Sequence, residues 1–261
     1  VIEPGEFVLG STHDDKLAEL NERPPTRVEI RTKFAISKYE ITREQFLKFA
    51  DLNPDKLDTI ECIAADGSHL QDPFNFIDPG FDQEDREPVV CVSWRDAFEY
   101  TKWLSDETGA TYRLPSEAEW EYVATEGGTA RINLENPQSI CDRGNIADEM
   151  ANLAQGKYAD AACMDGTAYT AAVGVKAGNR FGVFDTIGNV SEWVADCWTA
   201  SYSGEVKTGR PVERTNCETH VVRGGAWESE PYWQRFKLRS SGDYRTGTNF
   251  YGFRVVREMD Q

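Results

Sequence analysis

The stretch Val221-Val222-Arg223-Gly224-Gly225-Ala226-Trp227-Glu228-Ser229-Glu230 is the most informative part of this sequence. Two adjacent glycines allow positive φ angles and the close approach of other groups. A second stretch, Gly252-Phe253-Arg254-Val255-Val256, is typical of a strand. We therefore predict a final pair of strands that encloses a loop of about 25 residues, and function concentrates in long loops held by a rigid scaffold.

The composition is that of a folded acidic protein. Of its 261 residues, 39% are hydrophobic, which is ample for a core, and the net charge is −17. Such a charge argues against nucleic acid and anionic membranes as partners, because their phosphates repel it. It indicates either a solvated acidic surface or the binding of divalent cations or a cation-rich partner. No apolar run reaches the roughly 20 residues that cross a bilayer.

The six cysteines favour disulfides. They are Cys62, Cys91, Cys141, Cys163, Cys197 and Cys217. No Cys-x-x-Cys pair occurs and the three histidines are dispersed, so a zinc site is not expected. We predict sequential pairing (62–91, 141–163 and 197–217) in a periplasmic or secreted protein. The alternative is six reduced cysteines in a cytosolic protein.

The sequence lacks a low-complexity linker and a fixed-period repeat, which favours one domain over residues 1–261. Strands are expected at 5–10, 28–30 and 34–39. Capping-box patterns at Thr42, Ser93 and Ser116 predict three helices, because each pattern satisfies opposing backbone donors at a helix start. These helices should run to about Ala50, to about Asp106 with Gly109 beyond its end, and through Val123. After about residue 126 the chain becomes irregular and rich in Gly, Asn and Asp.

Two groups of oxygen-bearing residues suggest calcium sites. Asp185 and Glu192 lie seven residues apart around Gly188, and hard cations bind carboxylate and carbonyl oxygens. By spacing alone, the sequence favours a turn with one helix-capping acid over a calcium site. Asn145-Ile146 with Asp165-Gly166-Thr167 forms a second, weaker candidate.

Seven motifs in order resemble the formylglycine-generating-enzyme (sulfatase-modifying factor) family, over essentially the whole chain. They are Gly5-Glu6-Phe7-Val8-Leu9-Gly10-Ser11, Tyr39-Glu40-Ile41-Thr42, Pro88-Val89-Val90-Cys91-Val92-Ser93-Trp94, Arg113-Leu114-Pro115-Ser116-Glu117-Ala118-Glu119-Trp120-Glu121, Gly188-Asn189-Val190-Ser191-Glu192-Trp193, Arg223-Gly224-Gly225-Ala226-Trp227 and Gly252-Phe253-Arg254. The resemblance implies a single, loop-rich α+β domain related to C-type lectins, with little regular secondary structure.

The resemblance also implies structural calcium. The first site would use Asp185, Gly188, Val190 and Glu192. The second would use Asn145, Ile146, Asp165 and Thr167.

The family's oxidase chemistry needs two cysteines that bind copper, and this sequence lacks them. The matching positions are Ser229 and Gln234, which are poor ligands for a soft metal. Copper is therefore not expected. The ergothioneine-type branch of the family, which uses an iron site made of histidines, does not fit either.

The remaining side chains of the loop suggest a base and a binding surface. Glu228 and Glu230 would face the same way in an extended segment, and a carboxylate shielded from water can act as a general base. The substrate would contact Trp227, Tyr232, Trp233, Arg235 and Arg239. Alternatively, both glutamates are solvated or pair with Arg235 and Arg239, and the two tryptophans belong to the core. Arg254 is expected to be a buried partner of an acid.

Two functions follow from the resemblance. One branch of exported bacterial members tailors a siderophore precursor, as in pyoverdine maturation, where the dihydro-chromophore of a peptide is oxidised. The sequence favours such an enzyme, metal-independent and with a glutamate base, acting on a small molecule or peptide. The alternative is a non-catalytic module that binds a protein or ligand through residues 226–250.

Overall fold

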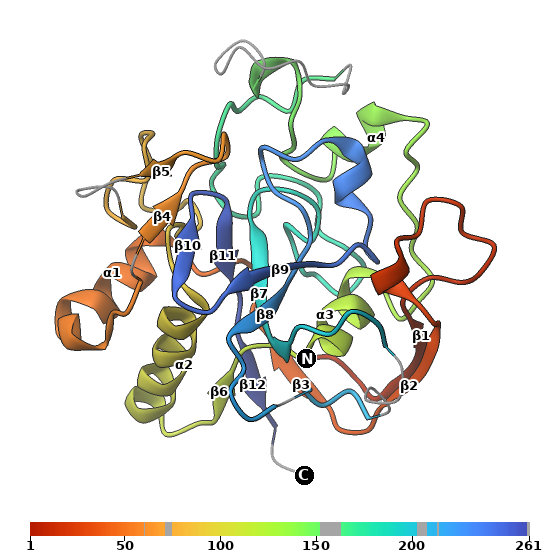
Figure 1. Ribbon diagram of the computed structural model, residues 1–261, viewed down its shortest axis with the longest axis horizontal. Coiled ribbons are helices and arrows are strands. Elements are labelled where there is room, and N and C mark those ends of the chain that lie inside the picture. The colour runs from red at the N-terminus through yellow and green to blue at the C-terminus, as the bar shows by residue number, and fades with distance from the viewer. Residues whose placement is uncertain (60, 71–74, 152–162, 203–207, 213, 260–261) are drawn as a thin grey trace.

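The computed structural model describes residues 1–59, 61–70, 75–151, 163–202, 208–212 and 214–259. These residues form an α+β domain with much loop between short elements (Figure 1). The helices are α1 (Arg43–Leu52), α2 (Trp94–Thr108), α3 (Glu117–Ala124) and α4 (Pro137–Cys141), with 3-10 turns η1 (Leu20–Glu22), η2 (Pro54–Lys56) and η3 (Pro231–Gln234). The strands are β1 (Gly5–Leu9), β2 (Thr26–Ile30), β3 (Phe34–Ile36), β4 (Glu61–Ile63), β5 (His69–Leu70), β6 (Tyr112–Arg113), β7 (Ser191–Cys197), β8 (Thr219–Arg223), β9 (Ser240–Asp243), β10 (Thr246–Thr248), β11 (Tyr251–Phe253) and β12 (Val256–Glu258). No described helix is long and apolar enough to cross a bilayer.

The central sheet has the strand order β11-β7-β8-β9. The prediction of a final strand pair is wrong in one respect, because β8 and β11 do not pair with each other. Both flank β7, with β8 antiparallel and β11 parallel to it. The segment between them also contains η3, β9 and β10. Strand β7 is buried and forms strand pairs along both of its edges. β8 pairs along one edge and β11 along the other.

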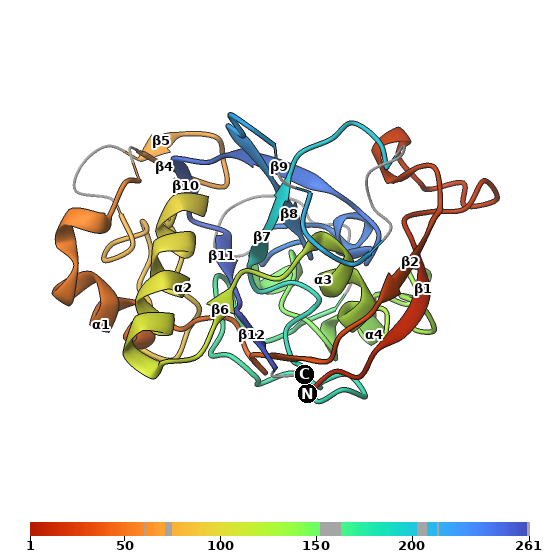
Figure 2. The same cartoon turned by 90° about the horizontal axis from the view of Figure 1, so that it is seen from below.

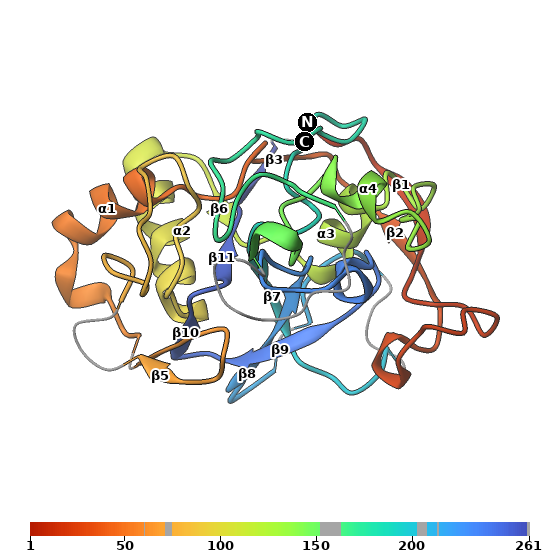
Figure 3. The same ribbon diagram turned by 90° about the horizontal axis from the view of Figure 1, so that it is seen from above.

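Three smaller sheets surround this centre. β1 pairs with β2 antiparallel, β12 lies between β3 and β6, and β4 lies between β10 and β5. Figures 2 and 3 show α1 and α2 at one end of the domain and the β1–β2 pair at the other. α3 lies between the β1–β2 pair and the central sheet (Figure 2).

The three predicted helices are present and their caps are as expected. The hydroxyls of Thr42, Ser93 and Ser116 accept hydrogen bonds from the backbone three residues further on, at 3.3, 3.1 and 3.0 Å. In each capping box, the side chain three residues after the cap also accepts a hydrogen bond from the backbone N–H of the cap residue. Gly109 ends α2 with a φ of 69°, a conformation that favours glycine.

The predicted cysteine pairing is confirmed. Disulfides join Cys62 to Cys91, Cys141 to Cys163 and Cys197 to Cys217. No cysteine is free. Each bond closes a loop of 20 to 29 residues and restricts the unfolded chain, which stabilises the fold by about 3 kcal/mol per bond. Two of them hold loops in the part of the chain with little regular structure.

His220 gives the fold a pH dependence. Its ring is buried and stacks on Trp94 at 3.6 Å, and burial lowers its pKa to about 4. Between pH 6.5 and 4 the unfolded chain binds this proton more readily than the folded one. Its contribution to stability is therefore present above pH 6.5 and is lost as the pH falls, by up to about 3 kcal/mol.

We expect His220→Phe, which retains a ring against Trp94, to weaken this dependence. The measurement is urea unfolding of both proteins between pH 4 and 7. The difference in their free energies of unfolding should change by up to about 3 kcal/mol across this range. A constant difference would show that His220 does not titrate in this way.

Candidate active site

A cavity of about 370 Å³ lies where the central sheet meets the segment that follows β8. Strand residues Arg223, Ser240 and Tyr251 form part of its wall. Glu228, Glu230 and Trp233 come from the segment between β8 and β9 and line it as well. The sheet therefore supplies a rigid wall, and the loop supplies carboxylates and an exposed aromatic ring.

The two glycines that follow β8 make this geometry possible. Gly224 and Gly225 have φ angles of 104° and 71°, values that few other residues adopt. A β-carbon on Gly225 would lie 2.6 Å from the Gln234 side chain and 2.9 Å from the carbonyl oxygen of Trp233. Only glycine therefore lets the chain turn this closely over η3.

The two predicted catalytic carboxylates both line the cavity but differ in environment. Glu228 is half-buried, whereas Glu230 is exposed. Ser229 donates a hydrogen bond from its hydroxyl to Glu228 Oε1 at 2.7 Å. The segment is not extended as expected, because a turn closed by the Ser229 N–H bond to the Ala226 carbonyl runs through it.

Trp227 and Trp233 have different positions. Trp227 is 2% exposed and donates from its indole to the Asn249 carbonyl at 3.1 Å. It therefore belongs to the core, which was one of the two interpretations of the sequence. Trp233 is 48% exposed and lines the cavity, where its ring is available to a ligand.

Tyr232, Arg235 and Arg239 contact the N-terminal part of the chain instead. The Tyr232 hydroxyl donates to Glu19 Oε1 at 2.6 Å. Arg235 pairs with Glu22 at 2.6 Å, and Arg239 pairs with Glu117 at 2.6 Å. None of the three lines the cavity. They hold its loop against the rest of the domain.

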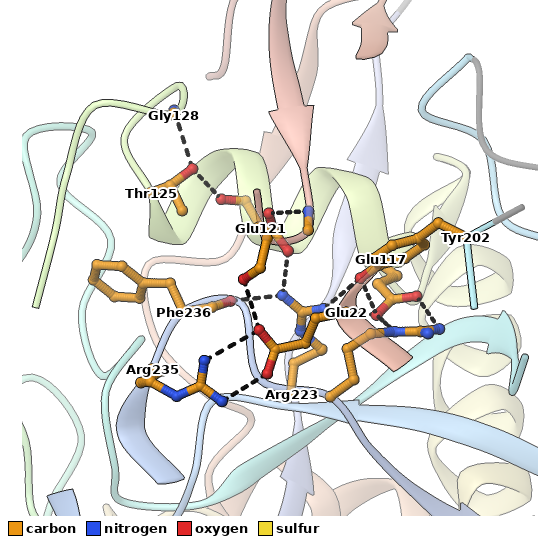
Figure 4. A network of polar contacts seen from close by, with 12 residues as sticks. Glu22, Glu117, Glu121, Thr125, Gly128, Tyr202, Arg223, Arg235 and Phe236 are labelled. Carbon is orange, nitrogen blue, oxygen red and sulfur yellow. Dashed lines mark hydrogen bonds and ion pairs between the residues drawn. The ribbon is translucent and has the colours of Figure 1, made fainter. Parts of the chain in front are cut away.

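Figure 4 shows a buried charge network around Arg223, a residue that also lines the cavity. Arg223 is fully buried and reaches Glu117 and Glu121 of α3, both at 2.6 Å. Its guanidinium also donates to the carbonyl of Phe236 at 2.6 Å. Burial by itself would raise the pKa of Glu117, but Arg239 and Arg223 hold that pKa below its usual value. Arg223 therefore links β8, α3 and the cavity loop.

The first predicted calcium site is a buried cluster of acids. Glu40, Asp185 and Glu192 lie there with Arg254, whose guanidinium makes two 2.6 Å contacts with Glu192. Arg254 is thus the buried partner of an acid, as predicted. Burial, and then the charges of Asp185 and Glu192, raise the pKa of Glu40 well above its usual value. The three acids outnumber the one guanidinium in this cluster.

The second predicted calcium site is also assembled. The Thr167 hydroxyl lies 2.9 Å from Asn145 Oδ1 and 3.1 Å from Asp165 Oδ1, and the Ile146 N–H donates to Asp165 Oδ2 at 2.7 Å. Burial raises the pKa of Asp165. Asn145 also forms a β-bridge with Gly188, so the two candidate sites are neighbours. This oxygen-rich set fits a hard cation.

The comparisons with known proteins agree with this architecture. The sequence profile described as "Sulfatase-modifying factor enzyme 1-like domain" matches residues 1–259. This chain belongs to the sulfatase-modifying factor family. It is 30% identical to the formylglycine-generating enzyme of Mycobacterium tuberculosis over 97% of this chain and 95% of that protein. It is 28% identical to the enzyme of Thermomonospora curvata, over 90% and 84%.

Solved structures include a similar member of bacterial origin. PvdO from Pseudomonas aeruginosa superposes with a TM-score of 0.83 and 31% identity, over 99% of this chain and 93% of that one. Treponema denticola variable protein 1 has a TM-score of 0.69 and 18% identity, over 99% and 94%. The second likeness shows the fold alone.

The sequence positions that match the family's copper cysteines lie beside the cavity. Ser229 lines it, and Gln234 is buried next to it. Gln234 Nε2 donates to the carbonyl oxygen of Ser229 at 2.9 Å, so the two positions are adjacent in space. All six cysteines of the chain are in disulfides elsewhere.

Sequence reasoning missed three residues of these sites. Glu40 was visible in a family motif but had no assigned role, because it lies 145 positions before Asp185. Tyr251 and Ser240 line the cavity, and burial raises the pKa of Tyr251. No local pattern marks these two residues, because pairing of separate strands brings them together.

Proposed function

We propose that this member of the sulfatase-modifying factor family is an exported oxidative tailoring enzyme of the pyoverdine-maturation type. Its substrate would be the dihydro-chromophore of a peptide or siderophore precursor. The observation that carries the proposal is a cavity with a half-buried carboxylate at the place where the family's cysteine pair is replaced. The likeness to PvdO, with 31% identity and a TM-score of 0.83, supports it.

The chemistry requires a base and an electron acceptor. As a new ring double bond forms, the dihydro ring loses two protons and two electrons, and Glu228 takes one of the protons. The two electrons pass to dioxygen, which takes up both protons and leaves as hydrogen peroxide. Trp233 and Tyr251 both line the cavity and offer aromatic surface to the ring. This reaction needs no thiolate-bound copper.

Three disulfides in a chain of 261 residues support an oxidising compartment, because thiols stay reduced in the cytosol. A periplasmic or secreted location follows as part of the proposal. The net charge of −17 favours a small-molecule or peptide partner over nucleic acid or an anionic membrane.

Oxygen consumption tests this function. Purified protein is mixed with dihydro-chromophore peptides of different peptide sequence, and oxygen uptake, peroxide and the absorbance of the oxidised ring are followed together. We expect equal amounts of oxygen consumed and peroxide formed. If no such peptide is turned over but one binds in a calorimetric titration, the alternative function as a binding module of residues 226–250 is correct.

We also propose that the two acidic clusters bind structural calcium. Glu40 and Asp185 would hold one ion near Gly188, Val190 and Glu192, and Asn145, Asp165 and Thr167 would hold the other near Ile146. The ions would neutralise buried carboxylates and join loops that have little regular structure. Their role is in stability and includes no step of the oxidation.

Removal of calcium should lower the melting temperature by about 5–10 °C, since a ligand at about 100 times its Kd contributes about 2.7 kcal/mol. The measurement is thermal unfolding in calcium and in a chelator, with the metal content found by mass spectrometry. Magnesium serves as the control ion, and Asp185→Asn should reduce the calcium response. Identical melting in calcium and chelator, with no calcium in the purified protein, would contradict the proposal.

A further inference from the structure

We infer that Ser229 and Gln234 form a hydrogen-bonded brace that positions Glu228 in the cavity. They occupy the two positions where the family resemblance places copper-binding cysteines. In this chain the pair has a different use, which is to orient a carboxylate instead of binding a metal. The functional part of this inference rests on the proposed role of Glu228 as base.

Ser229 contacts the carboxylate directly. Its hydroxyl donates to Glu228 Oε1 at 2.7 Å and accepts from the Ala226 N–H at 3.1 Å. A single hydroxyl thus joins the base to the backbone just after Gly224 and Gly225. Because Ser229 is only 8% exposed, water competes poorly for these bonds.

Gln234 holds the same turn from the other side. Its Nε2 donates to the carbonyl oxygens of Ala226 and Ser229, at 3.2 and 2.9 Å. The side chain is fully buried and packs against Gly225, where any β-carbon would lie 2.6 Å from Gln234 Oε1. Together with the Ser229 N–H bond to Ala226, these contacts leave the turn from 226 to 229 one backbone conformation.

The brace has a chemical consequence for Glu228. A hydrogen bond donated to a carboxylate favours its charged form, which is the form that accepts a proton. The Ser229 hydroxyl also holds Oε1 of Glu228 in place, so Oε2 of the same carboxylate points in a defined direction. Ser229 and Gln234 are therefore positioning residues, because they act on the reaction only through Glu228.

The test compares Ser229→Ala with Ser229→Thr, which retains the hydroxyl. The NMR signal of the Glu228 carboxyl carbon is assigned by its disappearance in Glu228→Gln. The midpoint of its titration should move to higher pH in Ser229→Ala. The acid limb of the kcat profile should move with it, and kcat at neutral pH should fall about tenfold while KM changes less than about twofold. Ser229→Thr should restore the titration midpoint and kcat to the wild-type values. Gln234→Leu should move the titration midpoint to higher pH, as Ser229→Ala does.

Ser139→Ala is the control, because it removes a hydroxyl of α4 that bonds to the Asn136 carbonyl at 2.7 Å, away from the cavity lining, and should leave the Glu228 titration in place. An unchanged titration in Ser229→Ala, or an equal change in Ser139→Ala, would overturn the brace. The NMR titration needs no turnover. A wild-type protein that oxidises no dihydro-chromophore, but whose Glu228 titration responds to Ser229, would end the proposed function and leave the brace standing.

Discussion

Arg223→Met should lower the free energy of unfolding by about 3–5 kcal/mol, because it removes the ion-pair partner of buried Glu121 and one of the two arginines that pair with buried Glu117. The side chains of Arg223 and Glu121 are fully buried, and that of Glu117 is 2% exposed. Methionine fills much of the same space but offers no donors. Glu117 still has Arg239, whereas Glu121 loses its arginine and retains the Gly10 N–H at 2.8 Å.

Urea unfolding followed by tryptophan fluorescence measures this effect. Adding Glu121→Gln to Arg223→Met should recover part of the loss, because the most isolated acid is then neutral. Arg27→Met is the surface control, since the Arg27–Glu6 pair is exposed and exposed pairs contribute little to stability. A loss at Arg223 no larger than at Arg27 would mean that the network does not hold the fold together.

Glu228→Gln should reduce kcat by about 10²- to 10⁴-fold, the range that a positioned general base contributes. Glutamine has nearly the same shape and can still accept from the Ser229 hydroxyl, so substrate binding should change little. Glu230→Gln should reduce kcat far less. Glu230 is exposed, and Glu228 is the carboxylate that Ser229 holds in the cavity.

Initial rates of oxygen uptake at several substrate concentrations separate the two variants. Circular dichroism and melting temperature should match the wild type in both, so that lost activity is not lost fold. If Glu230→Gln were the inactive variant, the base would be Glu230 and the exposed carboxylate would have to become buried when substrate binds. Full activity in both would exclude a glutamate base in this cavity.

The helices were predictable because their signals are local. At Thr42, Ser93 and Ser116, a hydroxyl and an acid or amide three residues later satisfy each other's backbone donors within a single turn. The strand order was not predictable, since β7 enters between β8 and β11 from a segment more than 20 residues away. Strand pairing depends on the whole core, which a local pattern does not describe.

The candidate site was likewise predictable in part from the sequence. The Arg223–Trp227 motif located the cavity loop, which the two glutamates follow closely, and the Gly188–Trp193 motif contains part of the first candidate calcium cluster. The second cluster, Asn145-Ile146 with Asp165-Gly166-Thr167, lies outside the seven motifs. The predicted contacts of Arg235 and Arg239 with substrate did not agree with their positions. A buried arginine needs an acidic partner, but the sequence does not say which one. Glu22 lies 213 residues from Arg235, and Glu117 lies 122 residues from Arg239.

By itself, the amino-acid sequence determined the family, the helix starts, the acidic character of the protein and the absence of cysteines from the loop after Gly224-Gly225. These follow from residue identity and short-range geometry. Only the tertiary structure decided that Glu228 is half-buried beside Ser229 while Glu230 is exposed, and that Arg223 lies fully buried in the wall of the cavity. Burial and charge pairing depend on which distant segments pack together, so they become known only when the chain is folded.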